Sequence, residues 1–233
     1  MGVPSGIGRR LRSALDIEAV PQVFASHRAG PLLLLNPRRL EIVLSAAAYP
    51  GLHLRSVSRL LLQPLPTLRF HVTALKAARL LNSRPFFGRL ALFVRDLYPR
   101  VAEPLLVAWE DPPMREILRR LRTESPASIR DLAQELRTSV ASVRGGANRL
   151  RSLAAVCWIR GGERIGLSHR WHEFEALCRN ERHHRAEKID ALFQEENLHP
   201  KVAELGEGSY RFEVDGPRFR MRFTLPLDPL LRA

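Results

Sequence analysis

Lysine, cysteine and long apolar runs are scarce in this sequence. Lysine supplies three of the 37 basic residues, so 34 are arginines. The two cysteines, Cys157 and Cys178, form no C-x-x-C pair and are too few for a disulfide framework, so both are expected to be small buried residues. The apolar run 31–35 is far shorter than the roughly 18 residues that a membrane-spanning helix needs. No apolar stretch follows the arginines of residues 1–15, so we expect no secretory signal and a cytoplasmic protein.

Known catalytic motifs are absent as well. The sequence has no G-x-x-x-x-G-K-[ST], no G-x-S-x-G and no H-E-x-x-H pattern. The acidic residues are dispersed among arginines, and the pair Glu195-Glu196 is too isolated to hold the divalent cation of a nuclease. We therefore expect neither an enzyme nor a cofactor. We also expect no metal site, because the spacing of the possible ligands matches no zinc finger: His169, His172, Cys178, His183 and His184.

The charge is unevenly distributed along this basic chain. The formal net charge is +13 and the pI is about 11.2. Residues 179–233 have ten basic and ten acidic side chains, so the whole excess belongs to residues 1–178, with 27 basic and 14 acidic side chains. A GC-rich coding sequence can enrich a protein in arginine, but it does not sort charge by segment. The asymmetry indicates a polyanionic partner for the basic part and a different role for the neutral part.

The sequence resembles itself at an offset of 75 residues, without a gap. Asn36-Pro37 aligns with Asp111-Pro112, at what would be the start of a helix in each copy. The other matches fall largely on predicted buried positions, which favours two copies of one structural unit. They pair Glu41-Ile42 with Glu116-Ile117, Leu54-Arg55 with Ile129-Arg130, Thr67-Leu68-Arg69 with Ser142-Val143-Arg144, and Leu75-Lys76 with Leu150-Arg151.

Each copy is predicted to be three helices followed by a two-stranded hairpin. Asn36 is a favourable N-cap, and the proline after it fits the first helical position. Leu68, Val72 and Leu75 lie on one narrow stripe of the third helix, as Val143, Ala147 and Leu150 do in the second copy. The expected helices are 37–49, 54–61, 66–78, 113–122, 128–136 and 140–152, and the hairpins are expected to turn at 85–88 and at Gly161-Gly162.

This order of elements is that of a winged helix-turn-helix domain. Residues 54–81 resemble ArsR- and MarR-like regulators, in which a helix of the pattern S/T-hydrophobic-R-x-H-hydrophobic-x-x-L-x-x-A-G-L-hydrophobic follows the turn; here residues 67–81 are TLRFHVTALKAARLL. Residues 36–168 as a whole are similar to predicted archaeal transcription regulators that have two such domains in tandem. Arg79 and Ala154 depart from the pattern, because that family usually has a glycine where the helix ends in a left-handed residue.

The expected fold class is α+β, mainly helical with small β wings. It comprises two tandem winged helix-turn-helix domains and a C-terminal unit of one helix and three strands. That unit, in which residues 179–233 have no net charge, is expected to mediate homodimerisation or another interaction. The expected division of the chain is a flexible N-terminal extension (1–31), a first copy (32–98), a linker (99–110), a second copy (111–168) and the C-terminal unit (169–233).

The resemblance implies that the third helix of each copy lies in the major groove of duplex DNA, with the hairpin near the phosphates. Phe70 either contacts a thymine methyl or packs on its own hairpin or on the other copy, and packing is favoured. Gly145-Gly146 permits close approach to a phosphate, or else marks a later helix start or a kink. The candidate DNA-contacting residues are Thr67, Arg69, Phe70, Thr73, Lys76, Arg84, Arg89, Ser142, Arg144, Asn148, Arg149, Arg151, Arg160 and Arg164.

The net charges of the two copies favour a DNA-binding function. Residues 32–98 have ten basic and two acidic side chains (+8), and residues 111–168 have eleven and six (+5). We therefore predict a transcription regulator that binds duplex DNA at the nucleoid. Two alternatives stay open because a fold does not determine a function: an architectural chromatin protein that binds DNA without sequence preference, and a winged-helix protein-interaction scaffold.

Overall fold

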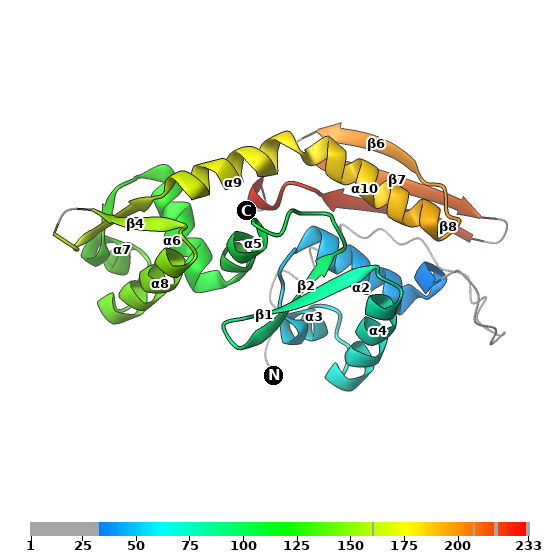
Figure 1. Cartoon of the computed structure of the whole chain (residues 1–233), viewed down its shortest axis with the longest axis horizontal. Helices are drawn as coiled ribbons and strands as arrows, with labels where there is room; N and C mark the ends of the chain where they lie inside the picture. Colours follow the sequence, from blue (N-terminus) through cyan, green and yellow to red (C-terminus); the bar gives the residue numbers. More distant parts are fainter. Residues whose placement is uncertain (1–32, 160, 207, 217–218, 232–233) are drawn as a thin grey trace. The chain divides into compact units, whose positions relative to one another are not determined.

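The computed structural model describes residues 33–159, 161–206, 208–216 and 219–231, and the expected N-terminal extension lies outside them. The fold is α+β, as predicted, with many helices and three small antiparallel sheets among the described residues (Figure 1). The chain forms two compact units. The first unit comprises Met1–Pro99 and Glu181–Ala233, and the second comprises Arg100–Asn180. Of the described helices, none combines the length and the apolar character that crossing a bilayer requires.

The first unit joins the first copy to a helix and a sheet from the C-terminal part of the chain. Its elements are η1 (Leu33–Leu35), α2 (Pro37–Ala48), α3 (Leu54–Leu60), α4 (Leu65–Ala77), β1 (Leu81–Phe86), β2 (Arg89–Val94), α10 (Arg182–Glu195), β6 (Lys201–Gly206), β7 (Ser209–Gly216), β8 (Phe219–Pro226) and η2 (Pro229–Leu231). The second unit holds the second copy between two further helices. Its elements are α5 (Glu103–Glu110), α6 (Pro112–Thr123), β3 (Ala127–Ser128), α7 (Ile129–Glu135), α8 (Val140–Ser152), β4 (Val156–Ile159), β5 (Arg164–Leu167) and α9 (His169–Asn180).

The two copies have helices of the same length at the same spacing. α6, α7 and α8 each begin and end 75 residues after α2, α3 and α4. An antiparallel hairpin follows the third helix in both copies, formed by β1 and β2 in the first and by β4 and β5 in the second. In the second copy β3 pairs with the outer side of β5, where the first copy has a single bridge between His53 and Ala91.

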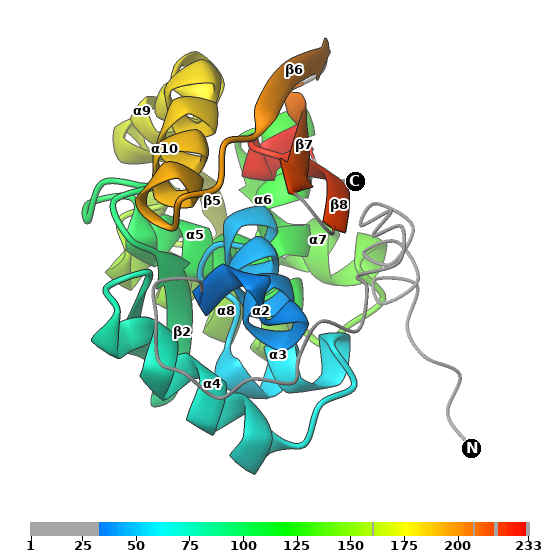
Figure 2. The same cartoon turned by 90° about the vertical axis from the view of Figure 1, so that its right-hand side faces the viewer.

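α2 is buried on more of its surface than its counterpart α6. Eight of the twelve residues of α2 are buried, against four of twelve in α6. α2 contacts β8, and the amide of Leu34 just before it donates to Glu196 Oε2 at 3.4 Å. In both views α2 lies between α10 and α4 (Figure 1, Figure 2). The C-terminal helix and sheet therefore complete the hydrophobic core of the first copy.

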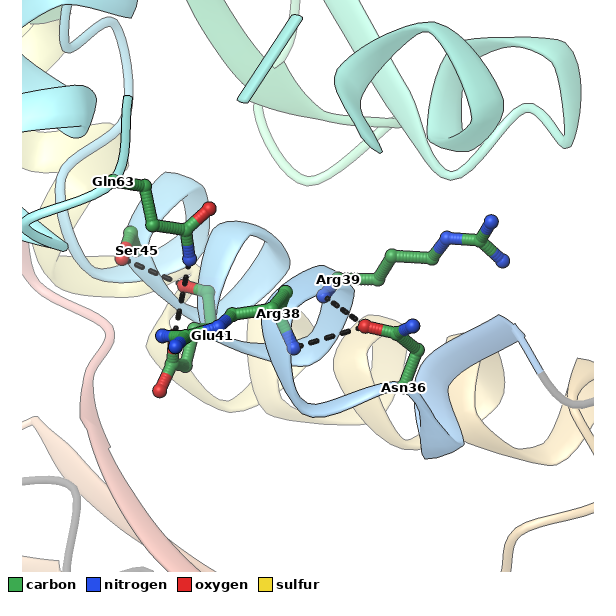
Figure 3. Close-up of polar contacts among 6 residues, drawn as sticks. All are labelled: Asn36, Arg38, Arg39, Glu41, Ser45 and Gln63. Carbon is green, nitrogen blue, oxygen red and sulfur yellow. Dashed lines mark hydrogen bonds and ion pairs between the residues drawn. The ribbon is translucent and has the colours of Figure 1, made fainter. Parts of the chain in front are cut away.

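The first helix of each copy starts at a side-chain cap followed by a proline. Asn36 Oδ1 accepts hydrogen bonds from the amides of Arg38 at 3.0 Å and Arg39 at 3.3 Å (Figure 3). At the same place in α6, Asp111 Oδ1 accepts one from the amide of Met114 at 3.4 Å. These bonds satisfy amides that no carbonyl of the helix can reach, and the proline pre-sets φ for the first turn. The predicted cap and first residue of α2 are confirmed, and α6, expected from about residue 113, begins one residue earlier, at Pro112.

The C-terminal sheet covers the first copy with one apolar face. β7 lies between β6 and β8, and its alternate residues Tyr210, Phe212 and Val214 are buried. Phe212 stacks on Phe223 of β8, with ring centroids 5.2 Å apart, and Phe193 of α10 stacks on the same ring at 5.4 Å. The alternation follows from the two-residue period of a strand, which places every second side chain on the helix-facing side.

Three expectations differ from the structure. Residues 99–110, expected to be a linker, contain α5, whose Trp109 is buried and packs against Trp171 of α9 with ring centroids 5.9 Å apart. The expected C-terminal unit is divided, since α9 belongs to the second unit and α10 with the sheet belongs to the first. Cys157, expected to be buried, is exposed, whereas Cys178 is buried. Apolar spacing shows that a segment is buried, but not which element buries it.

Arg79 and Ala154 both adopt the left-handed conformation, with φ of 59° and 55°. They directly follow Ala78 and Leu153, the C-cap residues of α4 and α8. The backbone therefore makes the turn that usually has glycine at this position, although neither residue is glycine. A non-glycine residue in this conformation costs about 1–2 kcal/mol.

Candidate nucleic-acid interface

The outward face of α4 carries five of the candidate residues. Leu68, Val72 and Leu75 are buried along one stripe of this helix, which leaves the opposite side in solvent. Phe70 is 68% exposed, and its ring touches that of His71 with the centroids 5.4 Å apart. Phe70 is therefore not buried against its own hairpin within the first unit. The candidates on this face are all exposed: Thr67, Arg69, Phe70, Thr73 and Lys76.

α8 presents a more polar face at the equivalent place. It begins at Ser139, whose Oγ accepts from the amide of Ser142 at 3.0 Å and lies 2.8 Å from the Ser142 hydroxyl. Val143, Ala147 and Leu150 are buried, as the sequence pattern predicts. The candidates on the other side of the helix are all exposed: Ser142, Arg144, Asn148, Arg149 and Arg151.

The arginines of the second unit divide into paired and unpaired groups. On α6, Arg119 lies 3.5 Å from Glu116, Arg120 pairs with Glu135, and Arg122 lies 2.6 Å from Glu175. On α8, by contrast, neither Arg144 nor Arg151 has a carboxylate within 4.0 Å among the described residues. Arg69 and Lys76 on α4 and Arg89 on β2 also have no carboxylate within 4.0 Å in the part of the chain that the structure describes. The third helices therefore concentrate cationic groups that no carboxylate of the described chain neutralises.

The hairpin arginines lie in different surroundings. Arg89 is exposed at the start of β2, opposite Phe86, whereas Arg84 is half-buried in β1 opposite Ala91. Arg164 is exposed on β5, but its guanidinium donates to the carbonyl of Pro126 at 2.7 Å, which holds it against the strand beside it. Arg160 lies outside the described residues.

The turn between α3 and α4 is held from within the first unit. Ser58 Oγ donates to the carbonyl of Gln63 at 2.6 Å, and the amide of Gln63 donates back to the carbonyl of Ser58 at 3.0 Å. Gln63 Nε2 also donates to Glu41 Oε2 at 3.3 Å, as Figure 3 shows. α2 therefore helps to fix where α4 begins. Sequence reasoning did not identify this contact, because a hydrogen bond between residues 22 positions apart leaves no local pattern.

His71 is a half-buried titratable group on α4. Burial lowers the pKa of its imidazole below the usual value, and the nearby positive charges of Arg39 and Arg38 lower this pKa further. Its Nδ1 is buried and has no hydrogen-bond partner among the described residues. The neutral imidazole is therefore the favoured form beside the exposed ring of Phe70.

The two adjacent glycines of α8 have different surroundings. A Cβ added at Gly146 would lie 2.7 Å from Ile117 Cδ1, so this glycine lets α8 pack closely on α6. A Cβ added at Gly145 would meet nothing within 4 Å of the described chain. Both glycines lie inside a continuous helix that starts at Val140, so a later helix start does not account for Gly145.

The histidines of α9 and α10 lie close to carboxylates on their own helices. His169 Nε2 lies 3.2 Å from Glu173, and His184 Nδ1 lies 3.1 Å from Glu187. Within the described ranges, no three His, Cys, Asp or Glu side chains come together where they could hold a metal ion.

The chain is similar to an uncharacterized HTH-type transcriptional regulator of Methanocaldococcus jannaschii, with 35% identity over 133 residues. The aligned part covers 57% of this chain but 33% of the relative, so the chain spans about a third of the length of the protein it matches. No protein-family model matches the chain. The relative is named for a helix-turn-helix, the motif that the sequence resemblance places in both copies.

Proposed function

We propose that this protein is a DNA-binding transcription regulator that contacts duplex DNA with two winged helix-turn-helix domains. The observation that carries the proposal is the pair of exposed third helices, α4 and α8, at the same place in two copies of one helical arrangement. Each bears basic side chains that pair with no carboxylate of the described chain. The similarity to a protein named an HTH-type transcriptional regulator supports the same function.

The chemistry of the two faces fits contact with DNA. A third helix of this type lies in the major groove, where arginine can pair with guanine and asparagine with adenine, while a hairpin lies near the phosphates. The net charges of +8 and +5 for residues 32–98 and 111–168 attract a polyanion. A protein that binds chromosomal DNA in this way would act in the cytoplasm, at the nucleoid.

A gel-shift titration at two salt concentrations tests the proposal. The full chain is titrated against duplexes recovered from a random-sequence pool and against unselected duplexes. A regulator prefers the recovered duplexes, and log K falls with log salt by about 0.9 for each phosphate contacted. Equal binding to both sets supports the architectural alternative. Absence of binding leaves the protein-interaction scaffold and contradicts the proposal.

A pair of variants connects the binding to the proposed face. Arg144→Ala with Arg151→Ala removes two unpaired charges from α8, and we expect a weaker affinity and a salt slope lower by about 1–2. Arg220→Ala with Arg222→Ala is the matched control, because it removes two charges from β8, where Arg220 pairs with Asp215 and Arg222 with Glu213, each at 2.9 Å. Equal effects of the two changes would show that net charge alone is responsible.

We also propose that the protein forms a homodimer through the C-terminal sheet. β6 lies at one edge of that sheet, and all six of its residues are exposed. Its Val202 and Leu205 are 40% and 46% exposed, which is unusual for an edge strand that stays solvated. Sedimentation should give twice the chain mass, and Val202→Lys should reduce it toward the monomer. A monomeric wild-type protein would exclude this dimer.

A further inference from the structure

The surface around the third helix has diverged between the two copies, although the backbone has not. Leu62, 66% exposed, has φ of 53°, and its equivalent 75 residues later is Arg137, with φ of 50°. Phe70 occupies the position of Gly145 on the outward face of the third helix. At the hairpin tips, Phe87 with φ of 48° is equivalent to Gly162 with φ of 71°. The same backbone therefore carries large apolar side chains in one copy and a cationic or absent side chain in the other.

Gly145 serves no packing function that the fold requires. A glycine inside a helix lowers stability relative to alanine, and here there is open space for a Cβ. The neighbouring Gly146 is different, because Ile117 fills the space where its side chain would be. The exposed residues within four positions of Gly145 on α8 include Ser142, Arg144 and Asn148, whose side chains offer hydrogen-bond donors. A missing side chain among donors allows the backbone of α8 to come close to base edges.

Phe70 gives α4 a different capability. Its exposed ring stands between two threonines, Thr67 and Thr73, and beside the cationic Arg69. In the major groove the apolar group on a base edge is the 5-methyl of thymine, and aromatic or threonine side chains make apolar contact with it. Arg69 and Lys76 on the same helix can hold the phosphates on either side.

We propose that the two third helices of one chain recognise different base chemistry, so that the DNA sequence bound by a single chain has two dissimilar parts. α4 contacts thymine methyl groups through Phe70. α8 approaches closely at Gly145 and recognises guanine or adenine through Arg144 and Asn148. This inference rests on the proposed DNA-binding function and specifies what each half of the DNA site contains.

The experiment compares duplexes with and without the thymine methyl. Duplexes recovered from a random-sequence pool by the wild-type full chain are sequenced and are then remade with deoxyuridine in place of thymidine. We expect the sequence bound by one chain, whether it occurs once or is repeated by a dimer, to contain two dissimilar parts, one of them rich in thymine. Wild-type affinity should fall about fourfold for each contacted methyl that is lost. Phe70→Ala should bind the thymidine duplex more weakly than wild type does. Replacing thymidine with deoxyuridine should not lower the affinity of Phe70→Ala any further.

The glycine is tested in parallel with its neighbour. Gly145→Ala should melt at a higher temperature than wild type but bind the recovered duplexes roughly tenfold more weakly, because the new methyl separates the two surfaces. Gly146→Ala should melt at a lower temperature, and Ala191→Ser at an exposed position of α10 should leave DNA affinity unchanged.

Three outcomes would overturn the inference while leaving DNA binding intact. The first is that Gly145→Ala binds with wild-type affinity. The second is that deoxyuridine has the same effect on Phe70→Ala as on wild type. The third is that the sequence bound by a single chain consists of two identical parts. If Phe70→Ala binds every duplex as wild type does, Phe70 makes no contact with DNA and the inference about α4 fails. If the wild-type chain binds no duplex, the proposed function itself fails and the inference fails with it.

Discussion

At the scale of single residues, two helix ends have a backbone that their side chains do not favour. Arg79 and Ala154 are left-handed, and the Cβ of a non-glycine residue is strained there. Ala154→Gly should therefore stabilise the protein by about 1 kcal/mol, measured by urea unfolding of the full chain. The control is Ala155→Gly, which removes a fully buried methyl from the adjacent residue and should destabilise the protein by about 1 kcal/mol. A loss of stability in both variants would contradict this account.

His71 gives the first unit a dependence on pH. Because burial and the charges of Arg39 and Arg38 lower the folded-state pKa, the unfolded chain binds a proton here at a pH where the folded chain does not. Neutral His71 therefore contributes fully to the free energy of unfolding above its pKa in the unfolded chain, which is about 6.5. This contribution is lost as the pH falls from there toward the lower pKa of His71 in the folded chain. Urea unfolding at about pH 8 and about pH 5.5 should show a smaller loss for His71→Gln than for wild type. Equal losses in the two proteins would assign the pH dependence to other groups.

At the scale of elements, local signals determined what could be predicted. The caps Asn36 and Asp111 and the apolar stripes placed the helices of both copies within about two residues, because these features depend on neighbours along the chain. The exposed face of α8 followed from the same periodicity. α5 was missed because its apolar residues were read as a linker, although Trp109 packs on α9. The same periodicity put Phe70 opposite the buried stripe of α4, where it is exposed, but it could not show whether the ring packs on its own hairpin, because that contact joins residues distant along the chain.

The contact from α2 to the start of α4 is an element-scale feature that can be tested. Glu41→Ala removes the acceptor for Gln63 Nε2 and should destabilise the first unit by about 1 kcal/mol. The matched control is Glu116→Ala at the equivalent place in α6, where the glutamate lies beside Arg119 on its own helix, and we expect a cost below about 0.5 kcal/mol. Thermal unfolding with circular dichroism compares the two. Equal costs would show that Gln63 contributes nothing to stability.

At the scale of the whole molecule, the neutral C-terminal part has a structural role in the first unit. The segment 181–231 covers α2, whereas α6 exposes its polar side and needs no such cover. The sequence held a signal of this difference, since α2 is apolar on nearly all sides and α6 is amphipathic. This pattern predicts that α2 is buried on several sides. It does not identify the segments that bury α2. Residues 181–231 have eight basic and ten acidic side chains, a balance that fits packing on the protein itself rather than on a polyanion.

The division into two units predicts different behaviour of two fragments. A fragment of residues 100–180 contains all of the second unit and should unfold cooperatively by circular dichroism on its own. A fragment of residues 33–99 contains α2 without α10 and β8, so it exposes Leu40, Ile42 and Val43 or their neighbours to water and should be unfolded or aggregated. Adding residues 181–233 as a separate chain should restore its helical signal. Cooperative folding of 33–99 alone would show that the first copy does not need the C-terminal segment.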